Sequence, residues 1–528
     1  MNQLLLIFLL LLGALITVPL ARKIGVPSPI LMTFLGVLLA LIPSVPQVSI
    51  NPDMILPLVL PPLLYAAAQR TTWRQFAENW QPITLLAVAM VMMTTAAVAF
   101  AAFLVIPGMT VAAAVTLGAL VAPPDPVAVT ALAGRLNLPR RLVSILEGEG
   151  LLNDVTAIVI YELAIVAAVS GHFSWRDAGI DLVLSASIAI AVGTVTGWLG
   201  VKLMRVLGDA SLRVGLSLLL PFAVFKVADD LHGSGVLAVV VTAIFLSEAW
   251  KDADDIEGRL TNKAFWRIME TLITGIAFGL IGLELPTVFT NAQGHLGYLA
   301  LWSVIIVGVV IGVRLFWLVP ATSLVRRTRR RFNPDAEIPA SWRETVVMWW
   351  AGMRGVASAA LALAIPFTVD SGEGFPARDI IIVIAFAVIM VTLVFQGTTL
   401  PIVVKLLNVA ADQDKQSRQE RHLAERAYFA ALDRINLLAA EGEIPPELVE
   451  PLGRRAYYMS SRLHPHFADE AQQESNQAAV VKMGQFRIGQ REMMSAAREA
   501  VLSERNKLGI DPEVVDHVVH MLDIRSPR

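Results

Sequence analysis

The chain is 528 residues long, with 55% hydrophobic residues, 16% charged residues and a formal net charge of −2. Ordinary soluble domains carry about 25% charged residues, so this composition argues against a water-soluble protein. The balanced charge gives no support for a nucleic-acid partner. Because there is no cysteine, the sequence gives no indication of the redox compartment.

The charges are concentrated near the C-terminus, where 35 of the 86 Asp, Glu, Lys and Arg residues lie in the last 123 positions. Runs of about 17 to 25 apolar residues are typical of membrane helices. We therefore predict an all-α polytopic membrane domain over residues 1–407 and a small helical cytoplasmic domain over residues 408–528. The predicted spans lie near residues 3–21, 27–44, 54–69, 82–106, 110–134, 143–170, 179–204, 212–230, 233–249, 266–290, 296–322, 344–368 and 379–405.

The basic residues of the short loops predict the orientation of these thirteen spans. One set of alternate loops holds 18 Lys and Arg residues and the other holds two, Arg176 and Arg378. Cytoplasmic loops carry an excess of Lys and Arg, which places the N-terminus outside and the C-terminal domain in the cytoplasm. The first run lacks a basic n-region and a clean cleavage site, so it is interpreted as an uncleaved span.

Three polar stretches interrupt the apolar spans, and the first is ALVAPPDPVAVTALAG at residues 119–134. Pro123, Pro124 and Pro126 remove backbone donors and break the helix. Broken backbone inside a membrane is tolerated only where protein or a water-filled cavity satisfies it. Asp125 lies in this break, and its charge favours a binding role over a simple helix cap.

The second stretch is GEGLLNDVTAIVIYE at residues 148–162, which places Glu149, Asn153 and Asp154 at bilayer depth. On a helix, Glu149 and Asn153 share one face, while Gly150 and Asp154 share another about 100° away. One carboxylate can therefore bind an ion while the other has a structural role. A charge at this depth costs about 2.5 to 3.5 kcal/mol or more, which indicates a function.

The third stretch is MWWAGMRGVASAALALAIP at residues 348–366, where Gly352 and Gly355 flank Arg354. The glycines weaken the helix, and an Arg at this depth needs a counter-ion. Glu149 or one of the two aspartates, Asp125 and Asp154, is expected to supply it, and a pair of Glu149 with Arg354 would hold the scaffold. Broken segments in the fifth and twelfth spans occupy corresponding positions of two halves, as in inverted-repeat transporters with discontinuous crossing helices.

Such a site could move ions. Partial burial of a carboxylate disfavours its charged form, so protons and alkali cations can compete for it near neutral pH. If the site opens alternately to each side only when occupied, one species is exchanged for the other. Asp154 with Asp125 is the predicted cation- and proton-binding pair, and oxygen ligands suit a small hard cation.

The motifs resemble a known family. GEGLLNDVTAIVIYE is similar to the E-S-L-L-N-D-A segment of NhaP-type sodium/proton antiporters, the bacterial relatives of the eukaryotic sodium/proton exchangers. VAPPDPVAV resembles their D-P-V turn, and WWAGMRGVASAALALAIP resembles their W-x-G-x-R-G span. Further matches are LPPLLYAA, HGSGVLAVV, FGLIGLELP and VFQGTTLPIVVKLL, which follow in family order up to about residue 407.

The resemblance implies an inverted-repeat antiporter fold of thirteen helices, a homodimer in the cell inner membrane, and exchange of protons for Na⁺. It implies that Asp154 binds the cation and the proton beside Asn153, that Asp125 contributes from the crossing, and that Glu149 pairs with Arg354. The Asn-Asp pair implies electroneutral one-for-one exchange. No cofactor is implied, and the transported ion is the only expected metal.

Three departures from the family pattern reduce the number of side-chain oxygens near the site. Pro124 stands where the family often has Thr, Gly150 where it often has Ser, and Ala66 where it often has an acidic residue. Li⁺ and K⁺ are therefore alternatives to Na⁺. The polar residues also fit a uniporter, a channel or a membrane-embedded enzyme that uses Asp125 and Asp154 as acid and base, although the chain has no HExxH and no serine nucleophile turn.

The remaining ionisable residues in the spans receive structural interpretations. Lys226, Asp229 and Asp230 are expected to solvate one another near the outer end of their span. Arg314 either extends toward the inner face or pairs within the bundle. Glu284 is expected either to line a funnel at the outer part of its span or to lie at the membrane–water interface.

Overall fold

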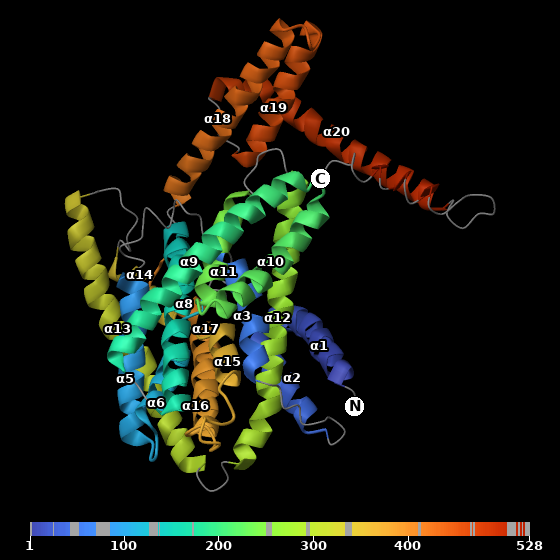
Figure 1. Cartoon of the computed structure of the whole chain (residues 1–528). Helices are drawn as coiled ribbons and strands as arrows, with labels where there is room; N and C mark the ends of the chain where they lie inside the picture. Colours follow the sequence, from blue (N-terminus) through green and yellow to red (C-terminus); the bar gives the residue numbers. More distant parts are fainter. Residues whose placement is uncertain are drawn as a thin grey trace. The chain divides into compact units, whose positions relative to one another are not determined.

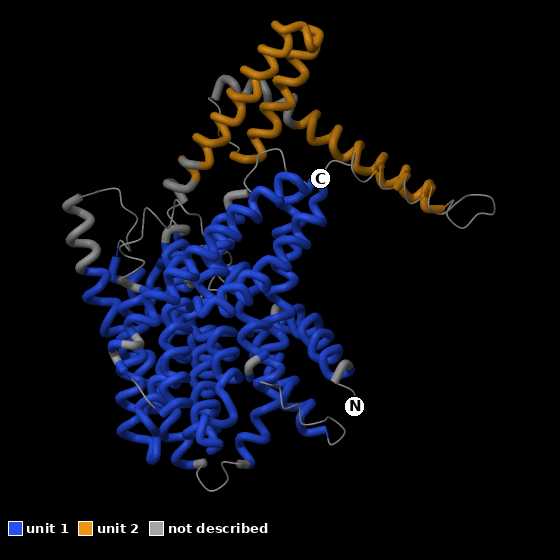
Figure 2. The backbone as a smooth tube through the Cα atoms, viewed as in Figure 1, with its two compact units in different colours: residues 1–410 blue, residues 411–528 orange. Residues whose placement is uncertain are grey.

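The computed structural model is helical throughout, apart from one isolated bridge between Thr368 and Gly374. It describes residues 3–24, 26–42, 52–69, 85–125, 136, 138–171, 174–249, 256–291, 296–332, 341–409, 413–464, 467, 470–503, 514–515, 518–519 and 521–522. The second half of the predicted fifth span, residues 126–134, lies outside these residues. The chain folds as two compact units, residues 1–410 and 411–528 (Figure 2).

The first unit contains the apolar helices shown in Figure 1. They are α1 (Gln3–Ile24), α2 (Ser28–Ala40), α3 (Pro52–Ala68), α5 (Met90–Val105), α6 (Val111–Val121), α8 (Arg140–Ser170), α9 (Trp175–Val206), α10 (Ala210–Asp230), α11 (Gly235–Ala249), α12 (Ile256–Asn291), α13 (Leu296–Phe332), α14 (Trp342–Trp350), α15 (Val356–Leu363), α16 (Arg378–Val391) and α17 (Gly397–Leu406), with π-helical turns η1 (Leu85–Ala89) and η2 (Thr392–Gln396). Among the described residues, seven helices are long and apolar enough to cross a membrane, and five shorter helices are also apolar. The prediction of an all-α polytopic membrane protein is therefore confirmed.

The helices of this unit pack as two bundles. Bundle A consists of α1, α2, α3, α9, α10, α11 and α12, and bundle B consists of η1, α5, α6, α8, α13, α14, α15, α16, η2 and α17. The bundles meet mainly where α12 and α3 of bundle A pack against α15, α16 and α8 of bundle B. Figure 1 shows α1 and α2 on one side of the unit and α5 and α13 on the other.

The outward surface of both bundles is apolar. On α9, for example, Ile190, Val195 and Trp198 are each about half exposed. A helix that is apolar on its outer face as well as its packed face is typical of a membrane environment, because lipid solvates that face.

In bundle B, α6 ends early and the predicted twelfth span is interrupted. The Thr110 side chain caps the start of α6 by accepting from the backbone N–H of Ala113 at 3.2 Å. The helix ends at Val121, and its C-cap Ala122 directly precedes Pro123 and Pro124. The predicted twelfth span is two short helices, α14 and α15, separated by residues 351–355. Both breaks occur where proline or glycine destabilises the helix.

Bundle A is held together by a close crossing of α2 and α12. Gly36 and Gly282 face each other there, and a Cβ added to Gly282 would lie against the backbone of Thr33 and Gly36. Small residues at such a crossing let the two backbones approach closely, which is how helices associate in lipid.

Replacing Gly282 by Ala should therefore destabilise the protein. The added methyl group meets backbone, which cannot move aside as a side chain can, and overpacking costs about 1 to 3 kcal/mol. The matched control is Gly308→Ala on α13, because nothing lies within 4 Å of a Cβ added there. Thermal unfolding in detergent should show a lower midpoint for Gly282→Ala alone, and equal midpoints for the two variants would contradict the close crossing.

The second unit has its own small core. It contains α18 (Gln413–Ala440), α19 (Val449–Leu463) and α20 (Glu470–Ser503), with a short 3-10 turn η3 (Pro446–Leu448). Tyr457 and Phe467 pack with Ala424, and the Tyr428 ring lies 5.4 Å from that of Phe467. This unit is helical, as the charged, amphipathic sequence predicts.

Candidate functional site

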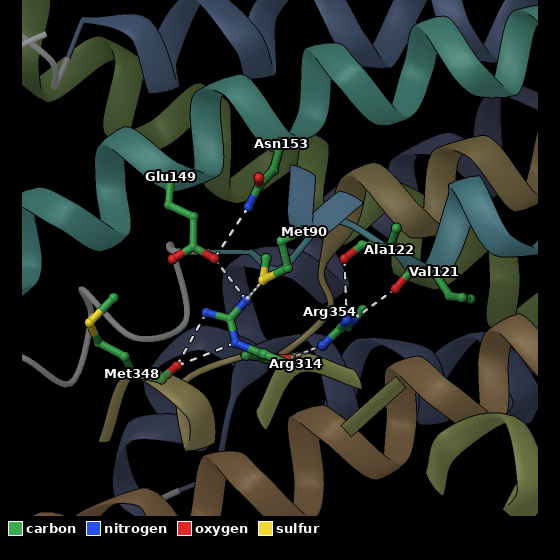
Figure 3. A network of polar contacts seen from close by, with 9 residues as sticks. Met90, Val121, Ala122, Glu149, Asn153, Arg314, Met348 and Arg354 are labelled. Atoms are coloured by element: carbon green, nitrogen blue, oxygen red, sulfur yellow. Dashed lines mark hydrogen bonds and ion pairs between the residues drawn. The ribbon is translucent and has the colours of Figure 1, made fainter. Parts of the chain in front are cut away.

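The polar stretch of α8 lies in the middle of bundle B. Glu149 and Asn153 are buried, with 1% and 0% of their surfaces exposed, whereas Asp154 is half-buried. Asn153 Nδ2 donates to Glu149 Oε1 at 3.4 Å (Figure 3). The neighbouring residues Asn153 and Asp154 therefore lie in different surroundings, as the helical spacing predicts.

The counter-ion of Glu149 is Arg314 of α13. Arg314 Nη1 lies 2.8 Å from Glu149 Oε1, and both side chains are 1% exposed. The same guanidinium donates from Nη2 to the carbonyl oxygen of Met348 at 3.2 Å, and its Nη1 also contacts the sulfur of Met90 (Figure 3). The prediction that Glu149 pairs with Arg354 is wrong, because Glu149 pairs with Arg314 instead.

Arg354 is stabilised by backbone oxygens. Its Nε donates to the carbonyl of Val121 at 2.8 Å and its Nη2 to that of Ala122 at 3.2 Å, while Nη1 donates to the carbonyl of Gly352. The last carbonyls of a helix have no partner within the helix and carry partial negative charge. The C-terminal end of α6 therefore accepts the guanidinium, which is the physical reason that Arg354 makes no direct ion pair with Glu149.

The residues that follow α6 meet the break between α14 and α15 at this point, which is called the crossing below. The backbone N–H of Asp125 donates to the carbonyl of Met353 at 2.6 Å. A Cβ added to Gly355 would overlap the Asp125 carboxylate, so only glycine fits here. The backbone N–H of Arg354 donates to Thr392 Oγ1 at 3.1 Å, which ties the crossing to η2. Turns of π-helix inside α-helices are frequent at functional sites.

The crossing places one carboxylate near another. Asp125 is half-buried at the break, and its charge acts on Asp154 of α8. Carboxylate oxygens with nearby carbonyls are ligands that suit a small hard cation, and a carboxylate can equally take up a proton. Within the described residues, Glu149 Oε2 and Asn153 Oδ1 are buried without a hydrogen-bond partner, so this region has further acceptor oxygens.

The three residues that depart from the family pattern are all buried in the structure. Pro124 and Gly150 are buried at the break and on α8, and Ala66 is 5% exposed on α3. None of these side chains supplies an oxygen. In the part of the chain that the structure describes, no three His, Cys, Asp or Glu side chains form a metal cluster.

The role of Arg314 is the main feature that sequence reasoning left open. The residue stands alone in the apolar run of α13, and an ionisable residue in a membrane span is a candidate functional residue by default. That rule gives Arg314 the same weight as Arg354. Nothing in the sequence itself assigns Glu149 to one arginine or the other.

The charges that were expected to be structural lie away from this crossing. Lys226 Nζ lies 2.5 Å from Asp230 Oδ1 and 3.9 Å from Asp229 Oδ2, and these side chains are more than half exposed. Glu284 pairs with Arg378 at 3.1 Å. Tyr161 Oη donates to the carbonyl of Leu361 at 2.9 Å and joins α8 to α15.

Comparisons with known proteins find a matching family model, similar relatives and a similar solved structure. A family model described as "Sodium/hydrogen exchanger, transmembrane" matches residues 7–406. The chain is 34% identical over 515 residues to the uncharacterized Na(+)/H(+) exchanger Rv2287 of Mycobacterium tuberculosis, covering 96% of this chain and 92% of that protein. It is 28% identical over 425 residues to a sodium, potassium, lithium and rubidium/H(+) antiporter of Bacillus pumilus, covering 77% and 62%. The solved structure of the sodium proton antiporter MjNhaP1 from Methanocaldococcus jannaschii matches with a TM-score of 0.60 and 19% identity over 76% of this chain and 97% of that one, which shows a similar fold.

Proposed function

The chain belongs to the sodium/hydrogen exchanger family and is a monovalent cation/proton antiporter, and from this premise we propose that it exchanges Na⁺ for protons by alternating access. The observation that carries the proposal is the half-buried carboxylate of Asp154 beside the crossing of two interrupted segments, where Asp125 lies. As a transporter it is not an enzyme, so an acid-base role for these aspartates is set aside.

The proposed mechanism uses Asp154 as the group that protons and the cation occupy in turn. Asp125 and backbone carbonyls of the crossing complete the ligand set. Glu149 is neutralised by Arg314, and Arg354 is compensated by the carbonyls of α6. These charges therefore stay fixed, and the carboxylates of Asp125 and Asp154 at the crossing are the proposed exchanging groups.

We propose one-for-one, electroneutral exchange. Asn153 cannot bind a proton at neutral pH, so it adds no second titrating group beside Asp154. An aspartate at the position of Asn153 would add a second exchangeable charge. The neutral amide instead donates to Glu149 and supports the scaffold.

A broader cation range is the second candidate function. Pro124 and Gly150 offer no hydroxyl oxygen to the ligand shell, so water or backbone carbonyls fill it. A shell with fewer fixed side-chain ligands discriminates less between cations of different size. The Bacillus pumilus relative is named for four alkali cations, which supports K⁺ and Li⁺ as further substrates.

The test is a pH-gradient dye assay in proteoliposomes with Na⁺, Li⁺, K⁺ and choline added in turn, run together with a potential-sensitive dye. We expect Na⁺ to dissipate the gradient, choline to do nothing, and no change of membrane potential to accompany the exchange. A response to K⁺ equal to that for Na⁺ favours the broader range. A potential change with Na⁺ would refute one-for-one exchange, and no response to any alkali cation would refute the proposal.

The proposed arrangement in the cell inner membrane has thirteen spans as two inverted repeats, the N-terminus outside, the second unit in the cytoplasm, and two copies forming a homodimer. The distribution of Lys and Arg in the loops supports the orientation. Single-cysteine labelling in sided vesicles tests it, because the chain has no cysteine of its own. Labelling of a cysteine in α18 from the outside would reverse the orientation, and a monomeric mass in detergent and in lipid would refute the dimer.

A further inference from the structure

One ion pair crosses the boundary between the two bundles. Arg378, the first residue of α16 in bundle B, lies 3.1 Å from Glu284 of α12 in bundle A, measured from Nη1 to Oε1. The two side chains are 11% and 27% exposed, so the pair is partly reached by solvent. The ion pair of Glu149 and Arg314, by contrast, is fully buried and lies within bundle B.

Arg378 is held firmly on its own bundle. Its Nε donates to the carbonyl oxygen of Ile365 at 3.1 Å, and its guanidinium lies 4.5 Å from the centre of the Phe367 ring. These contacts come from the chain that follows α15. The cation is therefore fixed to bundle B, and it is Glu284 that reaches it from the other bundle.

The pair lies at one defined end of the membrane unit. The backbone N–H of Asp370 donates to the carbonyl of Val169 at 3.2 Å, so the loop before α16 contacts the last turn of α8. Asp154 lies 16 residues before the end of α8 at Ser170, which is roughly 24 Å along a helix. Under the proposed alternating access, an ion that travels between Asp154 and this end moves along the boundary between the bundles, which the pair spans.

The boundary below the pair is tightly packed. On α12, Ala277 and Ile281 lie on the same side as Glu284 by helical spacing, and they are 1% and 2% exposed.

We propose that the ion pair of Glu284 and Arg378 is a gate that closes this end of the transport pathway and separates when the bundles open to that side. The inference rests on the proposed alternating access. A partly exposed ion pair contributes little net stability, so it can break and re-form during each cycle. A buried pair such as Glu149 and Arg314 is costly to break and stays intact.

A labelling experiment tests the gate without relying on transport. Because the chain has no cysteine, Ala277→Cys introduces a single thiol about 10 Å deeper than Glu284 along α12. A membrane-impermeant maleimide is added from the side where α16 begins. We expect Arg378→Gln to raise the labelling rate about fivefold, the effect of losing a partly exposed ion pair, and the charge swap Glu284→Arg with Arg378→Glu to return it to the parent rate.

The matched control is Lys226→Gln, which removes the exposed ion pair within α10 and should leave labelling unchanged. An unchanged rate in Arg378→Gln, or a charge swap that labels as fast as the single variant, overturns the gate. The folded yield of each variant is checked by size-exclusion chromatography.

A cross-link provides a second, independent measurement. In Glu284→Cys with Arg378→Cys, a short reducible bifunctional thiol reagent should stop cation/proton exchange in proteoliposomes, and a reductant should restore it. Full exchange in the cross-linked protein refutes the gate. If the unmodified chain itself shows no exchange, the proposed function fails, while the labelling result still decides whether the pair controls access.

Discussion

Replacing Asp154 by Asn should abolish cation-driven proton movement while the protein still folds. The amide has the shape of the carboxylate but can neither release a proton nor neutralise a cation, so exchange should fall by about a hundredfold or more. Asp154 is half-buried beside the crossing that holds Asp125, and the change leaves the ion pair of Glu149 and Arg314 in place. The measurement is the pH-gradient dye assay in proteoliposomes, with protein level and thermal midpoint recorded alongside.

The matched control neutralises a carboxylate of the same type elsewhere. Asp230 is exposed at the end of α10 and pairs with Lys226, so Asp230→Asn should keep exchange close to the parent rate. Exchange at the parent rate in Asp154→Asn would remove this residue from the mechanism. Equal loss in both variants would point to a general effect of charge on the protein rather than to an ion site.

The architecture of the membrane unit could be predicted from sequence because it depends on strong local signals. Long apolar runs predict membrane helices, and helix lies within each predicted range. Pro123 and Pro124 predict the end of α6, and Gly352 and Gly355 predict the break between α14 and α15, as the structure shows. The two-bundle arrangement could not be predicted in the same way, because it depends on which helix faces pack together across hundreds of residues.

The pairing of the buried charges shows where local reasoning fails. Arg354 stands in a conspicuous Gly-Met-Arg-Gly segment, so it was the natural counter-ion for Glu149, but its charge is compensated by carbonyls that the break in α6 leaves unpaired. Those carbonyls are backbone atoms and appear in no sequence motif. Arg314 lies 165 residues from Glu149, and only the packing of α13 in bundle B brings them together.

The two arginines therefore differ in the kind of partner they have, and stability measurements can separate them. Breaking a buried ion pair by removing one partner costs about 3 to 5 kcal/mol, because the other charge is left without compensation. We expect this loss for Arg314→Met, which leaves Glu149 charged and buried. Arg354→Met removes hydrogen bonds to the carbonyls of Val121 and Ala122, and each buried group left unpaired costs about 1 to 3 kcal/mol.

Adding Glu149→Gln to each arginine variant decides which arginine is the counter-ion of Glu149. Glu149→Gln should recover a large part of the stability lost in Arg314→Met, because it removes the uncompensated charge, but it should recover none of that lost in Arg354→Met. Directly contacting residues show interaction energies of about 0.5 to 3 kcal/mol in such cycles, so the difference is measurable from unfolding in detergent. If Glu149→Gln rescues Arg354→Met and leaves Arg314→Met unstable, Arg354 is the counter-ion after all. Glu149→Gln can restore stability only where the lost arginine was the counter-ion of Glu149, because only then is the Glu149 carboxylate left as an uncompensated buried charge.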